Sequence, residues 1–499
     1  MLPRLNIEPI EPGRETPTSS RPPPHRRAWV PALALVPLAL ALVWRIGELA
    51  LPPHLEHAWR DADGLGVARC FVREGFDLLK PRVMERGATS GIVGMEFPLV
   101  NALGAGLMAV GGMHDWLARL PCWLALVPLL LGGWALGGRL LGDASAAAMA
   151  AGCLVLQPLV VIYARKCMPD VPMLAALVWA MALAHDAFRR ASISRALAAG
   201  SLFALAALLK PTGFAVVVPL ALWLRRALRV HGGRPRIWCA AALCAAVPVA
   251  ATIVWYSHAR SLDERYGVAL FKLHHDWFEW VRELSNTSFY SVVFGRVFHL
   301  YLLWPTVLWM VLRWRDTVET ARQHLDLVSW AGAGLVAVIL FGGHLTNHPY
   351  YALPLLAPLA LLMGDFAARA GRAFRRPEFV GAAFMAVFAV TALVRVEQRA
   401  SRLGFDPARV AAAMAHLPVD GLTIATDERT NVVSLVILDR IGWALPPAEL
   451  TPAAIARLRA LGARTVVETS FGGWLPPGSR AALPAPVWID DQLRAYVLP

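Results

Sequence analysis

The sequence predicts an all-α polytopic membrane domain of about eleven transmembrane helices, followed by a small C-terminal α/β domain outside the membrane. Two observations predict the membrane part. Of the 499 residues, 57% are hydrophobic and only 17% are charged, whereas a soluble domain carries about 25% charge. The mean hydropathy is +0.50. A third observation, the mixture of helix-like and strand-like segments after residue 395, predicts the α/β domain. This composition excludes a disordered chain, collagen and a disulfide scaffold.

The chain divides into three predicted parts. Residues 1–27 contain Pro22-Pro23-Pro24 without apolar periodicity, and we expect a disordered cytoplasmic tail. Residues 28–395 form the membrane domain, and residues 396–499 form the α/β domain. The uncharged stretch Ala28 to Trp44 is the first span rather than a cleaved signal peptide, because the basic tail before it is long. The other predicted spans are 119–138, 145–163, 171–188, 194–209, 212–225, 237–257, 298–312, 326–342, 350–364 and 378–394.

The arginines predict the orientation of the spans. The formal net charge is +13, and only four of the 48 basic residues are lysines. The arginine clusters occupy alternate connections, which the positive-inside rule places in the cytoplasm together with the N-terminus. These clusters are short and adjoin apolar spans, so we expect membrane lipids as their partners and no nucleic acid. The connections are Arg139 to Asp143, Arg189 to Arg195, Arg225 to Arg236, Arg313 to Arg322 and Arg369 to Arg376.

Three large segments are expected on the opposite face, which we interpret as the periplasmic side of a bacterial inner membrane. They are residues 45–118, residues 258–297 and the chain after about residue 395. The first contains two helix-like stretches, Gly66 to Leu79 and Leu99 to Val110, which fit helices at the membrane surface.

The last segment shows the signals of a small α/β fold. Asp406-Pro407 is typical of a helix start, and the segment Leu422 to Thr426 is strand-like. Thr451-Pro452 begins a second predicted helix, which continues to Leu461, and Thr465 to Glu468 is again strand-like.

Acidic residues follow three membrane exits on this face. Asp61 and Asp63 lie after the first span, Glu96 precedes an apolar segment, and Asp170 lies between two spans. A simpler explanation for Asp61 or Asp63 is that one of them is the N-cap of the helix that follows. Convergence of all these acids is what a site at the membrane surface requires.

The sequence resembles the polytopic GT-C glycosyltransferases that use polyprenyl-phosphate sugars, including the protein O-mannosyltransferases and the lipid A aminoarabinose transferase. The resemblance runs from about Trp59 to Leu362. It implies that Asp63 is the catalytic aspartate, with Asp61 as the neighbouring option, and that Asp170 is the family's second acidic residue. The matching strings are Arg60-Asp61-Ala62-Asp63 with Ala68-Arg69, Glu96-Phe97-Pro98-Leu99 with Ala118-Arg119-Leu120-Pro121, Arg165 to Asp170, and His348-Pro349-Tyr350-Tyr351-Ala352-Leu353-Pro354.

The chemistry of such a donor fits these residue types. A phosphodiester-linked sugar already has a good leaving group, so the enzyme needs a base for the acceptor hydroxyl and cations for the phosphate. Direct displacement inverts the anomeric centre. We therefore expect an inverting transferase in which Asp63 is the general base and Asp61, Glu96 and Asp170 orient the reactants. The expected acceptor is a glycan, a lipid or a protein.

The lysines give a second indication of a phosphate site. All four fall on the predicted periplasmic side, against the bias of the arginines. Lys210 is the strongest candidate because it ends an uncharged apolar run, although snorkelling to the interface also explains it. The phosphate-binding candidates are Lys210, Lys166, Arg165, Lys80 and Arg69.

A polar and aromatic cluster between two spans is the predicted sugar or lipid surface. It contains His348, Tyr350 and Tyr351, together with His344 and Asn347. An interfacial aromatic belt explains the tyrosines alone, whereas a stacking surface explains the whole cluster.

Metal binding has weak support in the sequence. Adjacent histidines in His274-His275-Asp276 point in different directions on a helix, and the six cysteines lack metal spacing. The Asp-Ala-Asp string resembles a metal-binding Asp-x-Asp, but a lipid monophosphate donor offers no diphosphate to chelate. No cofactor is predicted, and a divalent metal stays possible without support.

Two other function classes compete with transfer. A transporter or flippase of lipid-linked glycans would place charges near the middle of spans, often within inverted repeats, whereas these acids lie at span ends. A membrane anchor for the C-terminal domain would leave Asp63, Glu96 and Asp170 replaceable.

Overall fold

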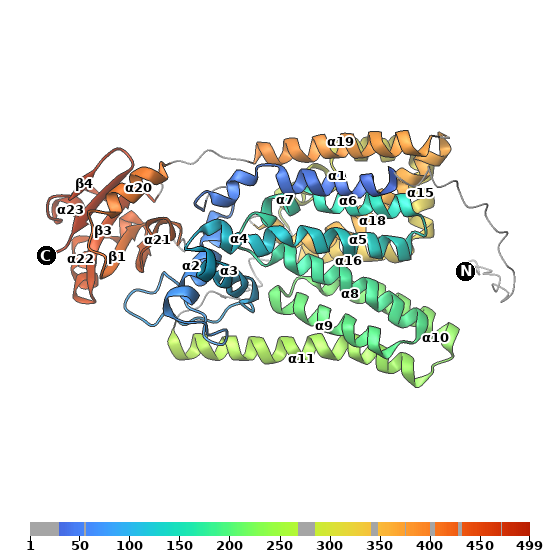
Figure 1. The fold of residues 1–499 in the computed structure, drawn as a ribbon, viewed down its shortest axis with the longest axis horizontal. Helices are drawn as coiled ribbons and strands as arrows, with labels where there is room; N and C mark the ends of the chain where they lie inside the picture. The colour runs from blue at the N-terminus through green and yellow to red at the C-terminus, as the bar shows by residue number, and fades with distance from the viewer. Residues whose placement is uncertain are drawn as a thin grey trace.

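In a computed structural model, the chain forms an elongated helical bundle with a smaller α/β domain at one end (Figure 1). We call that end of the bundle the domain end. The structure describes residues 29–53, 56–267, 285–340, 348–374, 376–399, 405–427, 432–470 and 472–499. The predicted tail, His274-His275-Asp276, Lys272, His344 and Asn347 therefore lie outside the described residues.

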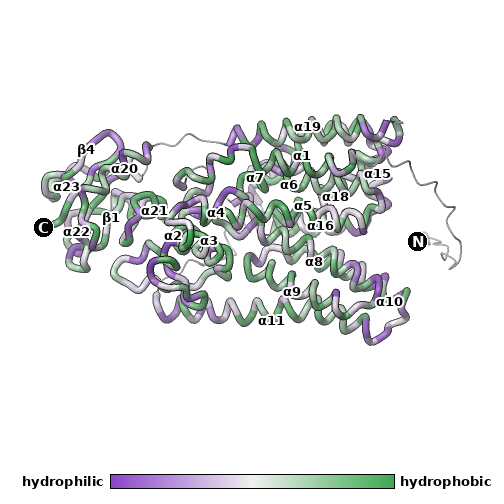
Figure 2. Tube along the Cα trace, in the orientation of Figure 1, coloured by the Kyte–Doolittle hydropathy of each residue, from purple (hydrophilic) through white to green (hydrophobic). Residues whose placement is uncertain are grey.

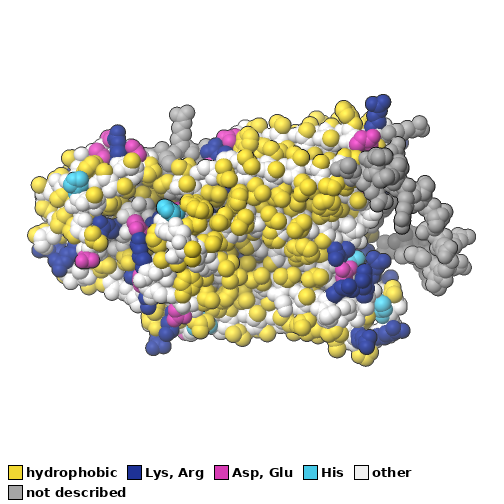
Figure 3. All heavy atoms as spheres, in the orientation of Figure 1, with side chains coloured by type: hydrophobic (Ala, Val, Ile, Leu, Met, Phe, Trp, Pro, Cys, Tyr) yellow, Lys and Arg dark blue, Asp and Glu magenta, His cyan; other side chains and the backbone are white. Residues whose placement is uncertain are grey.

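Helices of the bundle run along the long axis and connect at its two ends (Figure 1). Apolar residues dominate their middle parts, and charged side chains gather toward the ends (Figures 2 and 3). The bundle contains α1 (Trp29–Val43), α4 (Asp115–Leu124), α5 (Leu126–Leu140), α6 (Ala144–Leu156), α7 (Pro158–Ala164), α8 (Asp170–Arg190), α9 (Ile193–Leu209), η3 (Gly213–Val216), α10 (Val217–His231), α11 (Pro235–Tyr266), α13 (Thr287–Arg296), η4 (Val297–Tyr301), α14 (Trp304–Leu312), α15 (Trp314–Gln323), α16 (Leu325–Leu340), η5 (Pro349–Ala352), α18 (Leu353–Ala373) and α19 (Pro377–Gln398).

Length and apolarity identify this bundle as a membrane domain. Within the described residues, five helices are long and apolar enough to cross a bilayer, or seven if each of two bent helix pairs is one span. Shorter apolar helices coincide with the predicted spans 28–44, 194–209 and 326–342. The chain is thus an integral membrane protein, and the count of about eleven spans stays a prediction.

Two predicted spans are bent in the structure. The span 145–163 bends by 55° between Ala144–Leu156 and Pro158–Ala164. The span 298–312 is not one straight helix, because the chain bends by 87° between Thr287–Tyr301 and Trp304–Leu312. Leu303 has a left-handed backbone at the bend, and Pro305 follows in the first turn of α14.

The predicted spans 194–209 and 212–225 follow each other directly in the sequence, but their helices do not form a closely packed hairpin. Lys210 and Pro211 end α9, as expected. However, α9 packs between α8 and α11, whereas α10 packs on α8 and α16. The two helices diverge, and space opens between them.

The first connection contains η2 (Ile46–Ala50), α2 (Ala58–Glu74) and α3 (Leu99–Gly111). Helix α3 matches the predicted stretch Leu99 to Val110. Helix α2 begins eight residues earlier than the predicted Gly66 and ends before Leu79. Its N-cap is His57, so neither Asp61 nor Asp63 is a capping residue. Both aspartates instead lie inside the first turns of α2.

The C-terminal domain is a five-stranded sheet of order β2-β1-β3-β5-β4, with β1 parallel to β2 and β3 and antiparallel pairing at β5. Asp406 and Thr451 cap helices as expected. The elements are α20 (Pro407–Met414), β1 (Leu422–Thr426), α21 (Val433–Leu438), β2 (Gly442–Leu445), η6 (Pro447–Glu449), α22 (Pro452–Ala460), β3 (Ala463–Thr469), α23 (Pro477–Ala481), β4 (Trp488–Ile489) and β5 (Leu493–Val497).

One apolar core joins this domain to the membrane domain. Leu65 and Ala68 of α2 share a buried cluster with Leu435 and Val436 of α21. Arg86 and Gly87 donate backbone hydrogen bonds to the Gly442 carbonyl at 3.1 and 2.8 Å. The C-terminal domain is therefore docked on the helix that carries Asp61 and Asp63.

Candidate functional site

Helix α2 presents its two aspartates in different directions. Residues two apart on a helix point roughly 200° apart, whereas residues three apart share a face. Gly64 lets this helix approach the chain between α7 and α8, since a Cβ there would lie 2.0 Å from the Cys167 carbonyl oxygen. Asn101 donates a hydrogen bond to the Gly64 carbonyl at 2.9 Å and holds α3 to the same turn.

Asp61 is a fully engaged structural carboxylate. Arg119 donates to its two oxygens at 2.7 and 3.3 Å, and the Cys167 backbone N–H donates at 2.7 Å. Burial opposes the ionisation of Asp61, but the charges of Arg119 and Lys166 and these hydrogen bonds hold its pKa below the usual value. Arg119 also donates to the carbonyls of Leu49 and Leu51. Asp61 thus joins α2 to the first span's exit.

Asp63 lies beside a different pair of charges. Arg60, one turn earlier on the same face, approaches the Asp63 carboxylate to 3.8 Å and donates a short hydrogen bond to Glu96. Burial raises the pKa of Asp63, the Arg60 charge opposes the rise and the Glu96 carboxylate adds to it, and the resulting pKa is about 7. A carboxylate with that pKa is half ionised at neutral pH, which suits a general base.

Lys210 and Asp170 form the second buried pair of the site. The Lys210 ammonium donates to Asp170 Oδ1 at 2.6 Å and lies 3.7 Å from the centre of the Tyr350 ring and 4.9 Å from that of Tyr351. Burial lowers the pKa of Lys210, while the Asp170 charge opposes that shift. The Arg60 cation contributes to the lowering as well, so the two pairs influence each other.

Two carboxylate oxygens of this cluster lack donors. Glu96 Oε2 and Asp170 Oδ2 are buried and accept no hydrogen bond from the described residues. Buried polar atoms are normally hydrogen-bonded. Ligand hydroxyl groups would supply the missing donors.

Aromatic rings form one wall of the cluster. His348 stacks on Tyr350 with 5.4 Å between ring centres, and its Nδ1 lies 3.3 Å from His57 Nε2. Tyr163 packs edge-on against Tyr350 at 5.6 Å. Three of the residues predicted for sugar or lipid binding, His348, Tyr350 and Tyr351, are therefore brought together with Lys210.

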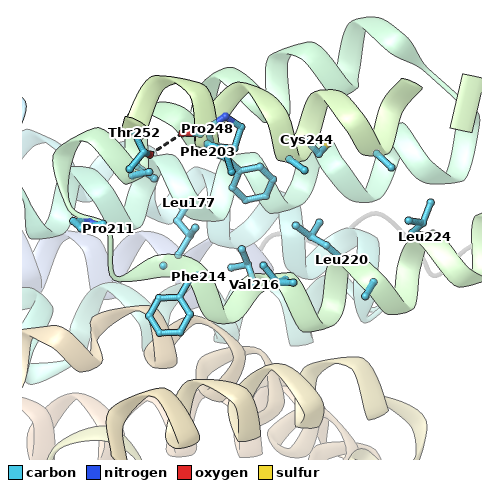
Figure 4. A pocket seen from close by; sticks show the side chains of 18 of the residues that line it. Leu177, Phe203, Pro211, Phe214, Val216, Leu220, Leu224, Cys244, Pro248 and Thr252 are labelled. Atoms are coloured by element: carbon cyan, nitrogen blue, oxygen red, sulfur yellow. Dashed lines mark hydrogen bonds between the residues drawn. The ribbon is translucent and has the colours of Figure 1, made fainter. Parts of the chain in front are cut away.

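An apolar cavity of about 570 Å³ begins at Lys210. Its lining comes from α8, α9, η3, α10 and α11, and it lies where η3 and α10 diverge from α9 and α11 (Figure 4). Phe203 and Leu177 face into it, and Thr252 is hydrogen-bonded to the Pro248 carbonyl of the same helix. Exposed apolar side chains at its border, Phe214 and Val217, continue it to the outer surface of the bundle.

Four predicted phosphate-binding residues lie elsewhere. The Arg69 guanidinium donates to Asp115, Asp439 and the Val436 carbonyl, and so it fastens α2 to the C-terminal domain. Arg165 is buried against Glu48 and the Trp44 carbonyl. Lys80 is exposed on the loop after α2.

Lys166 is buried on the Asp61 side of α2, and burial lowers its pKa to about 8 despite the Asp61 charge. Only Lys210 among the five phosphate candidates contacts the cluster of Asp170, Tyr350 and Tyr351.

Arg60 and His57 are parts of the site to which sequence reasoning assigned no role. The signal for Arg60 was present, since Arg60 and Asp63 are three residues apart. This spacing places Arg60 and Asp63 on one face only if the helix begins before residue 60, whereas the predicted helix began at Gly66. His57 offered no comparable pattern, because its contacts with Tyr163 and His348 join distant segments.

Neither Cys70 nor Cys167 forms a disulfide, and both are buried. Within the described part of the chain, no three His, Cys, Asp or Glu side chains converge closely enough to hold a metal ion.

The structure is that of a polytopic membrane protein with a cluster of acidic and cationic side chains at the domain end. The structure is similar to ArnT from Cupriavidus metallidurans bound to undecaprenyl phosphate, with a TM-score of 0.65 and 15% identity over 94% of this chain and 98% of that one. It is also similar to the archaeal oligosaccharyltransferase AglB from Archaeoglobus fulgidus in complex with an inhibitory peptide and a dolichol-phosphate. That similarity has a TM-score of 0.56 and 12% identity over 89% of this chain and 70% of that one.

Residues 96–255 match the family model of the dolichyl-phosphate-mannose-protein mannosyltransferases. The resemblance to the GT-C glycosyltransferases is thereby confirmed. No curated protein matches the sequence.

Proposed function

We propose that the protein transfers a sugar from a polyprenyl-phosphate donor to an acceptor at the extracytoplasmic face of the membrane, with inversion at the anomeric carbon. The position of Lys210 carries this proposal. Its ammonium lies between the polar cluster of Asp63, Glu96 and Asp170 and the apolar cavity. A lipid phosphate bound at Lys210 would place its isoprenoid tail in the cavity and its sugar toward the carboxylates.

The similar structures support a ligand of this kind. One is bound to undecaprenyl phosphate and another to a dolichol-phosphate. The two carboxylate oxygens without donors, on Glu96 and Asp170, fit sugar hydroxyl groups. The rings of Tyr350 and His348 add an aromatic surface beside them.

The proposed step needs one base and one cation. The acceptor hydroxyl attacks the anomeric carbon from the side opposite the phosphate, and Asp63 takes the hydroxyl proton. The bond between the anomeric carbon and the phosphate oxygen breaks, and its electron pair leaves with the lipid phosphate. Lys210 stabilises the departing anion. Arg60 orients Asp63 and Glu96, and Asp61 maintains the position of α2.

The test uses the full chain in lipid nanodiscs with radiolabelled polyprenyl-phosphate sugars and a total membrane extract as acceptor. Wild type should transfer label from one donor, and Asp63→Asn should reduce the rate by at least about 10²-fold, as expected for loss of a general base. Asp77→Asn is the matched control, because Asp77 is exposed on the loop after α2. Unchanged transfer in Asp63→Asn would remove Asp63 as the base.

Lys210→Gln tests the donor site separately. We expect the KM for the donor to rise about tenfold or more, because a charge-assisted contact to the phosphate is lost. Absence of transfer from every donor, together with movement of labelled donor across the bilayer, would favour a flippase instead.

A further inference from the structure

A second pocket at the domain end is built from arginines. It has a volume of about 290 Å³ and lies between α13, η4 and the last turn of α19. Its lining includes Arg296, Arg395 and Arg399, together with His299, Ser291 and Gln398. We call it the arginine pocket. None of these residues belongs to the site around Asp63.

The arginine pocket has excess positive charge. Arg399 is paired with Glu56, whereas Arg395 is held by neutral groups, Gln398 Oε1 at 2.7 Å and His299 Nδ1 at 3.0 Å. Among the described residues, Arg395 has no carboxylate partner. The neighbouring Glu397 is bound to the turn after α1, where it accepts from Trp44 at 3.1 Å and from Arg45 at 2.7 Å.

The location of these arginines opposes the usual charge bias. Most arginine clusters lie at the other end of the bundle, whereas the arginine pocket lies where α19 leaves the apolar region. A helix C-terminus favours cations, which accounts for Arg395 and Arg399 in the last turn of α19. Arg296 likewise lies in the last turn of α13, so the ends of two helices bring these cations together.

Apolar surface borders the pocket. Phe294 of α13 is 44% exposed, Trp304 at the start of α14 is 45% exposed, and Val394 of α19 is 47% exposed. A cationic pocket beside such surface at the end of a membrane span fits a molecule with an anionic head and an apolar tail.

The arginine pocket is separate from the apolar cavity at Lys210. The cavity lies along α9, α10 and α11, whereas α19 lies at the opposite edge of the bundle from α11 (Figure 1). The two are linked through the site, because Glu56, the partner of Arg399, directly precedes His57. An occupant of the arginine pocket would thus lie on the far side of the aromatic wall from the donor tail.

We propose that the arginine pocket binds the phosphate of a lipid headgroup from the membrane leaflet at the domain end. The guanidinium groups supply planar, charge-assisted donors that match phosphate oxygens. The exposed apolar residues of α14 and α19 contact the first part of the acyl or isoprenoid chain. This inference goes beyond the proposed transfer and requires only that the chain spans a membrane.

The test measures lipid binding to the purified full chain in neutral detergent by native mass spectrometry. The probes are phosphatidylglycerol, phosphatidylcholine, undecaprenyl phosphate and inorganic phosphate, each titrated separately. We expect Arg395→Gln and Arg296→Gln to weaken binding of an anionic lipid about tenfold, and Arg395→Lys to weaken it less. Arg260→Gln is the matched control, because Arg260 is 82% exposed and is paired with Glu264 near the same end of α11.

The probes distinguish the source of the phosphate. Arginine-dependent binding of phosphatidylglycerol identifies a bulk membrane lipid, and arginine-dependent binding of undecaprenyl phosphate alone identifies a polyprenyl lipid. Inorganic phosphate that binds as tightly as either lipid would overturn the lipid headgroup assignment. Equal binding of all probes by wild type, Arg395→Gln and Arg296→Gln would overturn the proposal altogether.

A thermal unfolding curve for each variant checks that the protein is folded. Asp63→Asn should keep the binding that depends on Arg395. Failure of the transfer assay and failure of this proposal are therefore distinguishable, because the lipid-binding readout does not use the Asp63 site.

Discussion

The two faces of α2 carry the same residue type in opposite electrostatic states. On one face, Asp61 is ionised and saturated by Arg119 and the Cys167 N–H. On the other face, Asp63 has only the 3.8 Å approach of Arg60 and lies near the Glu96 carboxylate, so its pKa is about 7. Surroundings rather than residue type separate a structural carboxylate from one that can exchange protons at neutral pH.

The largest expected effect is a loss of stability when the ion pair of Asp61 on α2 is removed. Asp61→Asn leaves the buried Arg119 guanidinium without its charge partner, and such losses cost about 3–5 kcal/mol. We expect a lowered free energy of unfolding in detergent at pH 7, with Asp77→Asn as the unchanged control. Stability equal to wild type would show that Arg119 is held by the Leu49 and Leu51 carbonyls alone.

The pH dependence of the transfer rate tests Asp63, on the other face of α2. If Asp63 is the base, kcat/KM should fall about fiftyfold from pH 7 to pH 5, as the ionised fraction falls from about a half to about one hundredth. The residual activity of Asp63→Asn should lack this limb. A wild-type rate that is flat across this range would exclude titration of Asp63 as the cause.

Stability should show the opposite pH dependence. The pKa of Asp63 is raised in the folded state, from 3.8 to about 7, so the folded chain binds more protons than the unfolded chain between these values. The contribution of this group to stability is therefore greatest at low pH and is lost as the pH rises, by about 2 kcal/mol from pH 5 to pH 7.

Asp63→Asn should remove that loss, because an amide does not ionise. The comparison is the difference in unfolding free energy between the variant and wild type at pH 5 and at pH 7. A difference that does not change with pH would contradict the raised pKa.

The smallest expected effect concerns the attachment of α2 to the C-terminal domain. Asp439 pairs with Arg69 and Arg73, but its side chain is 46% exposed. Its charge should therefore contribute about 1 kcal/mol or less to the free energy of unfolding. Asp439→Asn should change the unfolding midpoint slightly and the transfer rate less than about twofold. A large rise in donor KM would instead support Arg69 as a phosphate ligand.

Local patterns in the sequence were sufficient for the apolar membrane domain and for two of the five C-terminal strands, β1 and β3. Long apolar runs form helices in lipid because every backbone group is then satisfied within the segment. Asp406 and Thr451 cap helices for equally local reasons. Asp63, Glu96, Asp170 and Lys210 lie near one another in the structure, and their roles in transfer stay a prediction.

Only the tertiary structure decided which charged residue meets which. Arg69 and Lys210 are both cations on the same side of the predicted membrane. Arg69 is neutralised by Asp115 and Asp439, and Lys210 lies between Asp170 and the apolar cavity. Such pairings join residues up to 370 positions apart, and neither hydropathy nor spacing encodes them. The sequence by itself thus determined the membrane architecture and the residue types of the site, whereas packing determined the state of each charge.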